Sequence, residues 1–552
     1  MKRFDGVSLA LYQGLFAACA EEMGGTLMRT AHSPNIKERL DHSCAVFDGD
    51  ARLVAQAAHI PVHLGSLPRA VEAALAAGPL GPGDTVLLND PFAGGTHLPD
   101  LTLVSPVFLG RGSRPDFLVA SRAHHADVGG AAPGSMPLAR EVYEEGLRLP
   151  PVFLERAGLR QHDVLRLVLA NVRTPAEREA DLAAQLGAQA TGARRLEALA
   201  RRSGRGELMG AAAALMDHAE RCVRKALRTL PRGTHRFEDF LDDDGLGSGP
   251  VRIAVRLTLG GERLVVDFEG SSPQVRGPVN AVEAVTRAAT TYAVRCVLGG
   301  DFPVNDGAFR PLTVIAPPGT VVHALPPAAV GAGNVETSQR IVDVVLGAFA
   351  RALPDRVPAA SSGTMNNLLV GGVDPRNGEP FAYYETLAGG HGAGPGWDGA
   401  SAMQAHMTNT RNTPVEALEH AYPLRALGTG IRRGSGGRGR WRGGDGVVRA
   451  LELLAPARVT VISERRTRGP YGLGGGEAGA PGANRVALPV GRGGRKGARV
   501  QPGSTRKRVR ELPSKFQIDL DAGAVLTVAS PGGGGFGRTR RREKKAIARL
   551  RD

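Results

Sequence analysis

The sequence is poor in cysteine and in long apolar runs, and each shortage excludes a class of protein. Its 552 residues include four cysteines, which are widely scattered and therefore predict neither a disulfide framework nor a thiolate metal site. No apolar run approaches the about 18 residues that a membrane-spanning helix needs, so no membrane partner is expected. This cysteine usage is typical of a reducing compartment, and we expect a cytoplasmic protein.

Acidic residues are missing from residues 490–510 and scarce in residues 538–552. The first segment holds eight Lys or Arg and no acid, and the second holds eight against two acids, so together they carry +14 of the formal charge of +15. The rest of the chain is nearly neutral, unlike a domain that binds nucleic acid with a basic face, and neither segment offers aromatic rings for base stacking. We expect no nucleic-acid partner, and we interpret the two segments as a solvated loop and a solvated tail.

A phosphate-binding loop is also lacking. The glycines of 474–479 match the spacing GxGxxG, but residues 480–482 read Ala-Pro-Gly where a helix should begin. The glycines of 532–535 are not followed by Lys and Ser or Thr. The sequence therefore predicts no ATP site in this chain.

Imidazoles and carboxylates, in contrast, gather within residues 85–130, where three predicted strands end. The apolar runs Val86–Leu88, Leu101–Phe108 and Phe117–Ala120 are typical of buried strands. Loops at strand ends often carry function because the strands hold them still. The polar side chains at these ends are Asp90, His97, Asp100, His124, His125 and Asp127. Such a set suits a divalent metal; the alternative is a polar cluster that hydrogen-bonds within itself and caps the sheet.

Local spacing constrains which of these residues can act together. Pro99 and the glycines before His97 disfavour a continuing helix, so a turn would present His97 and Asp100 together. His124 and His125 are neighbours, and on a strand their side chains would point in opposite directions, so at most one is expected to be a ligand. We interpret His59 and His63, which flank Pro61, as structural or supporting residues.

Polar residues are also dense at 333–340 and 360–425. Asn334, Glu336 and Thr337 precede a predicted helix that runs to Leu353, and they could either cap it or present polar groups to a substrate. The later segment suits recognition of a small polar ring, and equally suits a loop network that satisfies its own backbone. The candidate substrate residues are Asn334, Glu336, Asn366, Asn367, His406, Asn409 and Arg411.

Several separate segments resemble the hydantoinase B family. That family includes the beta subunit of ATP-dependent N-methylhydantoinase, the C-terminal half of 5-oxoprolinase, and the alpha subunits of acetone and acetophenone carboxylases. The segments that carry the resemblance are SPNIKERLDHSCAVFD (33–48), AHIPVHLGS (58–66), NDPFAGGTHLPDLTLVSPVF (89–108), SRAHHADVGGAAPGSMP (121–137), GNVETSQR (333–340) and HMTNTRNTPVE (406–416). Family members tend to end in an acidic tail, and the basic residues after Gly537 depart from that pattern.

The resemblance implies a metal at the His-x-x-Asp pair and a later histidine. With it we predict that Asp90, His97, Asp100 and His124 bind a divalent metal (Mn, Fe or Zn). We predict Asp127 as general base and His125 as a second catalytic residue.

The resemblance also implies the reaction and the partner. We expect a metal-dependent subunit of an ATP-dependent enzyme that opens cyclic amides such as hydantoin, N-methylhydantoin or 5-oxoproline. A separate hydantoinase A-type ATPase subunit would use the ATP. One alternative is a subunit of an acetone- or acetophenone-type carboxylase. The other is a non-catalytic support subunit, and the presence of all six imidazole and carboxylate side chains named above counts against that second alternative.

Hydrophobic periodicity predicts a mixed α and β fold. We expect helices at 6–30 and 67–77, a hairpin from residue 42, and another hairpin around Gly260-Gly261. Residues 137–230, including EVYEEGLRLPPVF (141–153), are all predicted to be helical. The predicted parts are a sheet-based N-terminal part with the metal-site loops (1–136), a helical lobe (137–232), a central α+β part with the substrate loops (233–425), a β-rich C-terminal domain (426–537) and a basic tail (538–552).

Overall fold

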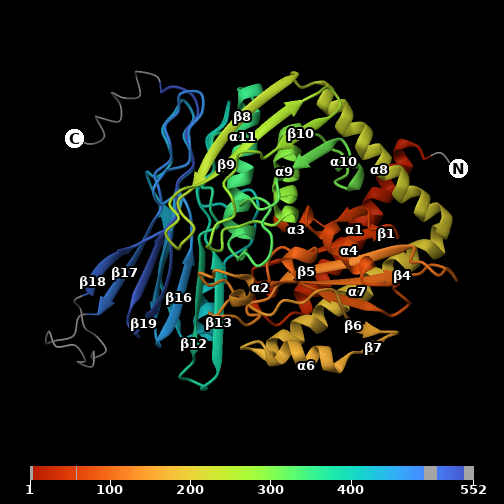
Figure 1. Ribbon diagram of the computed structural model, residues 1–552, viewed down its shortest axis with the longest axis horizontal. Coiled ribbons are helices and arrows are strands. Elements are labelled where there is room, and N and C mark those ends of the chain that lie inside the picture. The colour runs from red at the N-terminus through yellow and green to blue at the C-terminus, as the bar shows by residue number, and fades with distance from the viewer. Residues whose placement is uncertain (1–3, 58, 490–506, 540–552) are drawn as a thin grey trace.

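The structure is a computed structural model that describes residues 4–57, 59–489 and 507–539. Helices and four sheets alternate along these residues, which confirms the mixed α and β fold (Figure 1). Most of the two basic segments, residues 490–506 and 540–552, lies outside the described residues. Within the described part of the chain, every helix is too short or too polar to cross a membrane.

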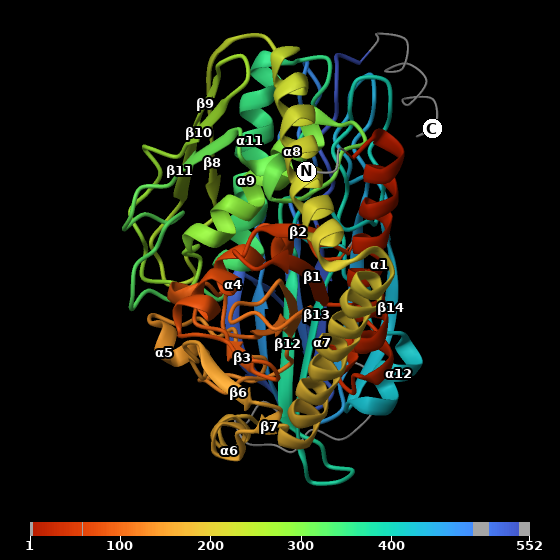
Figure 2. The same ribbon diagram turned by 90° about the vertical axis from the view of Figure 1, so that its right-hand side faces the viewer.

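The N-terminal half is built on a seven-stranded sheet with the strand order β2-β1-β5-β4-β3-β6-β7. Side chains alternate along β1, so that Cys44 and Val46 pack on one face while Ala45 and Phe47 pack on the other. Long helices α1 (Gly6–Thr30) and α7 (Pro175–Ser203) lie side by side against the first face, and α4 (Leu67–Ala76) covers the second (Figure 2). The strands are β1 (His42–Asp48), β2 (Leu53–Gln56), β3 (Thr85–Leu88), β4 (Asp100–Val107), β5 (Phe117–His124), β6 (Val152–Arg156) and β7 (Leu159–Arg160).

The region predicted to be wholly helical is helical only in part. Its helices are α5 (Val142–Glu145), α6 (His162–Ala170), α7 (Pro175–Ser203) and α8 (Arg205–Arg228). Strands β6 and β7 lie between α5 and α6 and extend the seven-stranded sheet, because β6 pairs with β3. Pro150 and Pro151 cannot continue a helix, and the Val-Phe-Leu sequence that follows favours a strand. The helical prediction for EVYEEGLRLPPVF is therefore wrong after Glu145.

The central part joins a smaller sheet to two buried helices. The sheet has the order β11-β10-β9-β8, and the predicted hairpin is formed by β9 and β10. Helix α11 packs against β8, β9 and α9, and a π-helical turn, η2, leads into it. The elements are β8 (Gly233–Leu241), β9 (Val251–Leu259), β10 (Leu264–Asp267), α9 (Glu283–Leu298), α10 (Asp306–Phe309), β11 (Leu312–Ile315), η2 (Gly333–Thr337) and α11 (Ser338–Ala352).

Two further sheets pack face to face across one hydrophobic core at the C-terminal end. Their strand orders are β13-β12-β16-β19 and β14-β15-β20-β17-β18, so that β12 pairs with β16 from beyond residue 426, and β13 joins the same sheet through β12. The strands are β12 (Asn367–Val373), β13 (Pro380–Thr386), β14 (Leu424–Arg432), β15 (Gly446–Leu453), β16 (Ala457–Ile462), β17 (Ala483–Pro489), β18 (Lys507–Leu512), β19 (Lys515–Leu520) and β20 (Val525–Ala529).

The remaining helices are mostly short. The long first helix, α1 (Gly6–Thr30), begins at Asp5, whose side chain accepts a hydrogen bond from the Ser8 amide and caps it. The others are α2 (Pro34–Lys37), α3 (Pro61–Leu64), α4 (Leu67–Ala76), η1 (Pro91–Ala93) and α12 (Val415–Ala421). The predicted helices at 6–30 and 67–77 and the hairpin from residue 42 are confirmed.

Candidate functional site

Three of the predicted ligands meet at the end of the seven-stranded sheet. The donor atoms of His97, Asp100 and His124 lie within 4.8 Å of one another, and all three residues are buried. His97 Nε2 lies 2.9 Å and His124 Nδ1 lies 3.2 Å from the same oxygen, Asp100 Oδ1. We call these three residues the metal cluster.

Strand pairing and one buried asparagine bring the cluster together. Asp100 is the first residue of β4 and lies directly opposite His124, the last residue of β5. Their side chains therefore lie on the same face at one end of the sheet. The loop before them is held by Asn89, which donates to the carbonyls of Leu98 (2.7 Å) and Leu147 (2.9 Å). The ends of two paired strands and a clamped loop thus fix the three ligands.

The hydrogen bond on the far side of His97 fits metal binding. His97 Nδ1 lies 3.1 Å from the carbonyl oxygen of Gly331, which can only accept, so Nδ1 carries a proton. In a neutral imidazole the lone pair of Nε2 then faces the carboxylate of Asp100, which is repulsive unless a cation lies between them or the ring is doubly protonated. Histidines that bind metals commonly donate their other N–H to a carbonyl in this way.

The space beside the cluster also fits an ion. It encloses about 20 Å³, enough for one water-sized particle. His124 Nε2 and Asn334 Oδ1 are buried near it, and neither finds a hydrogen-bond partner in the described part of the chain. Two imidazoles and a carboxylate are suitable ligands for Mn, Fe or Zn, so the donor set fits a divalent metal.

Electrostatics keep Asp100 in the ionised form that a ligand requires. Burial acts to raise the pKa of Asp100, but the surrounding histidines, His97 first, hold it well below its ordinary value. Burial opposes protonation of His97, yet the Asp100 carboxylate outweighs this and raises the pKa of His97. Burial lowers the pKa of His124, which favours its neutral, metal-binding form.

Other residues complete the surroundings of the cluster; the sequence indicated a structural or supporting role for His63, but it did not identify Asp41 or Tyr384. His63 Nε2 lies 3.4 Å from Asp100 Oδ2, and Asp41 lines the same small cavity. Tyr384 stacks on the ring of His124 with a centroid distance of 4.7 Å. Within the segment AHIPVHLGS, Pro61 starts the short helix α3 that carries His63, while His59 lies before that helix.

Asp90 and His125 lie outside the metal cluster. Asp90 caps η1 by accepting from the Phe92 amide (3.0 Å), and its other oxygen pairs with Arg148. His125 follows the end of β5 and points away from His124, as predicted for strand neighbours; its Nε2 is 3.0 Å from Gln185 Oε1 on α7. Neither position supports the predicted role, because Asp90 serves a turn and His125 joins the sheet to a helix.

Asp127 also serves the fold in this geometry. Its two carboxylate oxygens accept from the amides of Gly129, Gly134 and Arg173 and from the Arg173 guanidinium, so no lone pair is directed at a substrate. A general base needs a free lone pair within reach of the proton that it removes. The prediction of Asp127 as general base therefore has no support in the structure.

The predicted substrate residues divide into three groups. Asn334 donates to Asp100 Oδ2 (3.3 Å) and belongs to the surroundings of the cluster. The second group is Glu336, Asn366 and Asn367. Asn367 donates to Glu336 (2.7 Å) and Asn366 donates to the carbonyl of Leu387 (3.1 Å), so these side chains form hydrogen bonds within the fold. No side chain caps α11, because Asn334, Glu336 and Thr337 all bond elsewhere.

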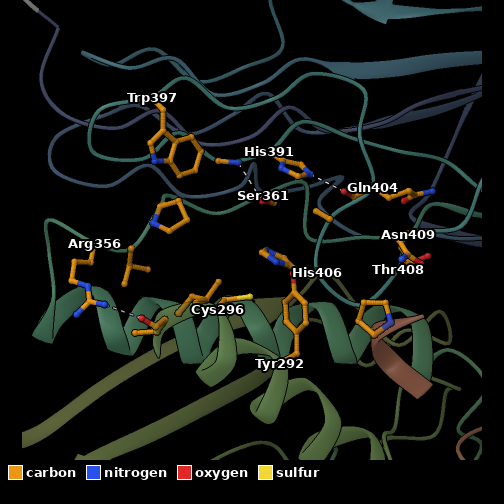
Figure 3. A pocket seen from close by; sticks show the side chains of 17 residues that line it. Tyr292, Cys296, Arg356, Ser361, His391, Trp397, Gln404, His406, Thr408 and Asn409 are labelled. Atoms are coloured by element: carbon orange, nitrogen blue, oxygen red, sulfur yellow. Dashed lines mark hydrogen bonds between the residues drawn. The ribbon is translucent and has the colours of Figure 1, made fainter. Parts of the chain in front are cut away.

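The third group is His406, Asn409 and Arg411. His406 and Asn409 line a larger cavity of about 320 Å³ (Figure 3), whereas Arg411 is exposed at the surface. Thr408 lines both this cavity and the small one beside the metal cluster, so one segment of chain forms a wall of each. The volume is within the range of about 300–1,000 Å³ typical of small-molecule sites.

Known proteins resemble the chain along nearly its whole length. The family model for Hydantoinase B/oxoprolinase matches residues 5–539. 5-oxoprolinase 1 of Arabidopsis thaliana is 38% identical over 97% of this chain, but the chain spans only 42% of that protein. A protein named as one subunit of a D-/L-hydantoinase, from Pseudomonas sp. (strain NS671), is 29% identical, and the match covers 99% of this chain and 92% of that one.

Two solved structures share the fold. The ATP-dependent caprolactamase from Pseudomonas jessenii has a TM-score of 0.87 and 29% identity, and the match covers 100% of this chain and 94% of that one. The nucleotide-free acetone carboxylase has a TM-score of 0.86 over 97% of this chain and 76% of that one, but at 19% identity it shows the fold alone. The chain belongs to the Hydantoinase B/oxoprolinase family.

Proposed function

We propose that this chain is the metal-dependent hydrolytic subunit of an ATP-dependent enzyme that opens small cyclic amides. The observation that carries the proposal is the convergence of His97, Asp100 and His124 beside a cavity of small-molecule size. Buried imidazoles that share one carboxylate oxygen are costly as a purely structural device, because buried charge needs compensation. A divalent cation supplies that compensation.

The three ligands would hold the metal, and the residues around them would fix its geometry. A bound divalent metal polarises a carbonyl oxygen and lowers the pKa of a coordinated water to about 7. Gly331 orients His97 through its carbonyl, Asn334 and Thr96 donate to Asp100, and Tyr384 packs on His124. Because two paired strand ends carry the cluster, the ligands need little movement to bind.

The ATP would be used by a separate ATPase subunit of the hydantoinase A type. Support comes from the lack of a phosphate-binding loop in the sequence and from the hydantoinase relative, whose name makes it one subunit of an enzyme. The 5-oxoprolinase relative is more than twice as long as this chain, which leaves room in that protein for an additional catalytic part. We expect the two subunits to copurify and to function in the cytoplasm.

A cyclic amide is the substrate class that the relatives favour. The relatives at 38% identity are 5-oxoprolinases, and the caprolactamase shares 29% identity over the whole chain. The carboxylase alternative rests on a structure that shares the fold alone. We therefore propose hydrolysis rather than carboxylation, with a neutral or anionic ring such as a hydantoin, 5-oxoproline or a lactam as substrate.

Metal analysis and a coupled assay test the proposal. The purified chain should contain about one equivalent of Mn, Fe or Zn. Together with its ATPase subunit it should open at least one of hydantoin, 5-oxoproline and caprolactam in an ATP-dependent reaction that a chelator abolishes. Full activity in metal-free protein, or ATP turnover by this chain alone, would contradict the proposal.

A further inference from the structure

A histidine outside the metal cluster projects into the larger cavity. His406 lies between His391 and Tyr292 in Figure 3, and it shares the cavity with Cys296. Its backbone has a φ of 57°, a left-handed conformation that is rare for a residue with a side chain. Such strained residues cluster at active sites, where the surrounding structure holds them in place.

The Nε2 atom of His406 faces a carboxylate that has a free oxygen. It lies 3.9 Å from Asp343 Oδ1, and both buried atoms lack a hydrogen-bond partner among the described residues. Asp343 is only 1% exposed, so bulk solvent does not surround its carboxylate. The distance is too long for a hydrogen bond, but a closure of about 1 Å would make one. Hydrogen bonds between catalytic groups are often long before the substrate binds.

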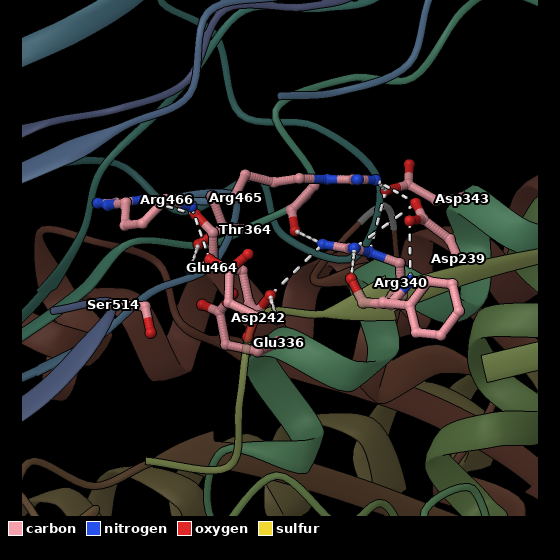
Figure 4. A network of polar contacts seen from close by, with 12 residues as sticks. Asp239, Asp242, Glu336, Arg340, Asp343, Thr364, Glu464, Arg465, Arg466 and Ser514 are labelled. Atoms are coloured by element: carbon pink, nitrogen blue, oxygen red, sulfur yellow. Dashed lines mark hydrogen bonds and ion pairs between the residues drawn. The ribbon is translucent and has the colours of Figure 1, made fainter. Parts of the chain in front are cut away.

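Asp343 is held from the opposite side by buried arginines (Figure 4). Its other oxygen, Oδ2, accepts from Arg465 Nη2 at 2.6 Å and lies 3.5 Å from Arg340 Nε. Arg465 also binds Asp239 at 2.6 Å, so both arginines are anchored in a wider network. This arrangement fixes the Asp343 carboxylate with Oδ1 directed toward the imidazole, and no other described residue forms a hydrogen bond with that oxygen.

From this geometry we infer that His406 is the acid–base residue for ring opening and that Asp343 positions its imidazole. The inference rests on the proposed function and assigns the larger cavity to the cyclic amide. Asp343 would accept a hydrogen bond from Nε2–H, which leaves the lone pair on Nδ1. Within the described residues no hydrogen bond to Nδ1 is formed, so this atom is available to a water or a substrate in the cavity.

The proton balance of the step is simple. The water oxygen forms a bond to the carbonyl carbon of the ring while Nδ1 of His406 takes a proton from that water. The ring C–N bond then breaks, and the same proton passes from His406 to the leaving nitrogen. Water is thus added across one C–N bond, and the imidazole returns to its neutral form.

The surroundings of His406 keep its imidazole neutral, and the charges that line the cavity disfavour a cationic substrate. Burial lowers the pKa of His406 to about 3, and the nearby His391 contributes to this shift. The titratable groups that face it are His391, Tyr292, Cys296 and Asp343. The residues that line the cavity include one arginine, Arg356, and no carboxylate. The charge on the cavity wall therefore favours a neutral or anionic ring over a cationic one.

Replacing His406 tests the inference in the complex with the ATPase subunit. For whichever of 5-oxoproline, hydantoin and caprolactam the wild-type complex opens, His406→Ala should reduce kcat by about 10²–10⁴-fold, the usual contribution of general acid–base catalysis. KM and metal content should change little, and added imidazole should restore part of kcat. His420→Gln, an exposed histidine on α12, is the matched control and should behave as wild type.

Asp343 needs a test that separates positioning from structure. Asp343→Asn should lower kcat when His406 is present and have no further effect on kcat in the His406→Ala background, because it acts through that residue. Asp181→Asn removes a carboxylate from a separate buried arginine pair, Arg178–Asp181, and should lower stability while leaving kcat unchanged. Equal losses of kcat in the two asparagine variants would contradict positioning by Asp343.

The outcomes distinguish this inference from the proposed function. Wild-type kcat in His406→Ala, with the metal bound and the wild-type complex active, overturns the inference alone. A wild-type complex that opens none of the three rings overturns both. Loss of kcat in His406→Ala with imidazole rescue and unchanged metal content supports both.

Discussion

The metal cluster and the His406–Asp343 pair lie beside adjacent cavities, but they are assembled in different ways. The cluster comes from one stretch of chain, with Asp100 and His124 opposite each other on neighbouring strands. The pair joins α11 to a loop more than sixty residues later, and the arginines that hold Asp343 come from both α11 and the chain after β16. The first arrangement depends on local pairing, and the second depends on the packing of the whole central region.

This difference predicts that the cluster controls metal binding while the central network controls stability. Buried ion pairs such as Lys515–Glu464 extend the network from α11 to β19. A change in the cluster should remove chemistry from a folded protein. A change in the network should weaken the fold and leave the ligands in place.

The largest effect on chemistry is expected from His97→Ala. The variant should lose its metal and all ATP-dependent ring opening, because it removes one of the three ligands, the imidazole that the Gly331 carbonyl orients toward Asp100 Oδ1. The fold should survive, since the residue lies on a turn at a strand end. Metal analysis, activity and circular dichroism of the same sample check this.

His125→Ala is the matched control for that variant. It removes an equally buried imidazole, that of the residue directly after β5, which contacts Gln185 rather than Asp100. It should keep its metal. Full metal occupancy and full activity in His97→Ala would show that the assigned cluster is wrong.

A large effect on stability is expected from Lys515→Met. Lys515 is fully buried and pairs with Glu464, so the variant removes the nearer of two cations from a buried carboxylate and leaves Arg340 at 3.6 Å; breaking a buried ion pair typically costs about 3–5 kcal/mol. Denaturant unfolding should show this loss while the folded fraction keeps its metal. The double variant Lys515→Met/Glu464→Gln should recover part of the stability. Loss of metal from the folded single variant would break the proposed division between the two regions.

The same contrast explains what could be predicted from the sequence. The strands around the cluster were predictable because short apolar runs ended in polar residues and glycines, and β3, β4 and β5 follow those runs closely. The cross-strand pairing of Asp100 with His124 then brought two predicted ligands together. The roles of Asp90 and Asp127 were not predictable, because a carboxylate that caps a turn and a carboxylate that binds a metal look alike in sequence.

Long-range packing limited the prediction elsewhere. His63 reaches Asp100 because α3 packs near β1 and α9, which no local pattern reports. Asp343 is one acidic residue in an amphipathic helix, and its contact with His406 depends on a loop that follows β13. Strand β6 itself has a local signal in the prolines before it and the Val-Phe-Leu sequence, and only its pairing with β3, about sixty residues earlier, is a long-range feature.

A smaller effect on metal affinity is expected from Glu145. This buried residue accepts from the amides of Val330 (2.9 Å) and Gly331 (2.7 Å), and so holds the carbonyl that orients His97. Glu145→Ala should weaken metal binding by about 10-fold, at the low end of effects from outer partners of metal ligands. Glu145→Gln keeps an acceptor oxygen and should bind metal nearly as wild type. Equal affinity in both variants and wild type would show that the loop needs no such support.

The same residue should make stability depend on pH. Burial raises the pKa of Glu145 to about 8, against an ordinary value of 4.5. Between these two values the folded protein holds a proton that the unfolded chain releases, so this stabilisation is present below pH 4.5 and is lost as pH rises toward 8. Unfolding free energies measured from pH 5 to 8 should fall less steeply in Glu145→Gln than in wild type. Identical slopes would mean that the carboxyl is already ionised in the folded protein.

The smallest effect is expected from removing residues 540–552. The segment contains seven Lys or Arg and two acids, Glu543 and Asp552, and contributes no histidine to the protein. Because the metal cluster and the His406–Asp343 pair are complete without it, truncation should leave metal content and kcat unchanged. A net positive charge attracts acidic partners over a distance, so any change should appear in the rate of association with such a partner and should vanish at high salt. Loss of metal on truncation would instead show that the basic tail closes the site, and the separation between a locally built cluster and the rest of the chain would fail.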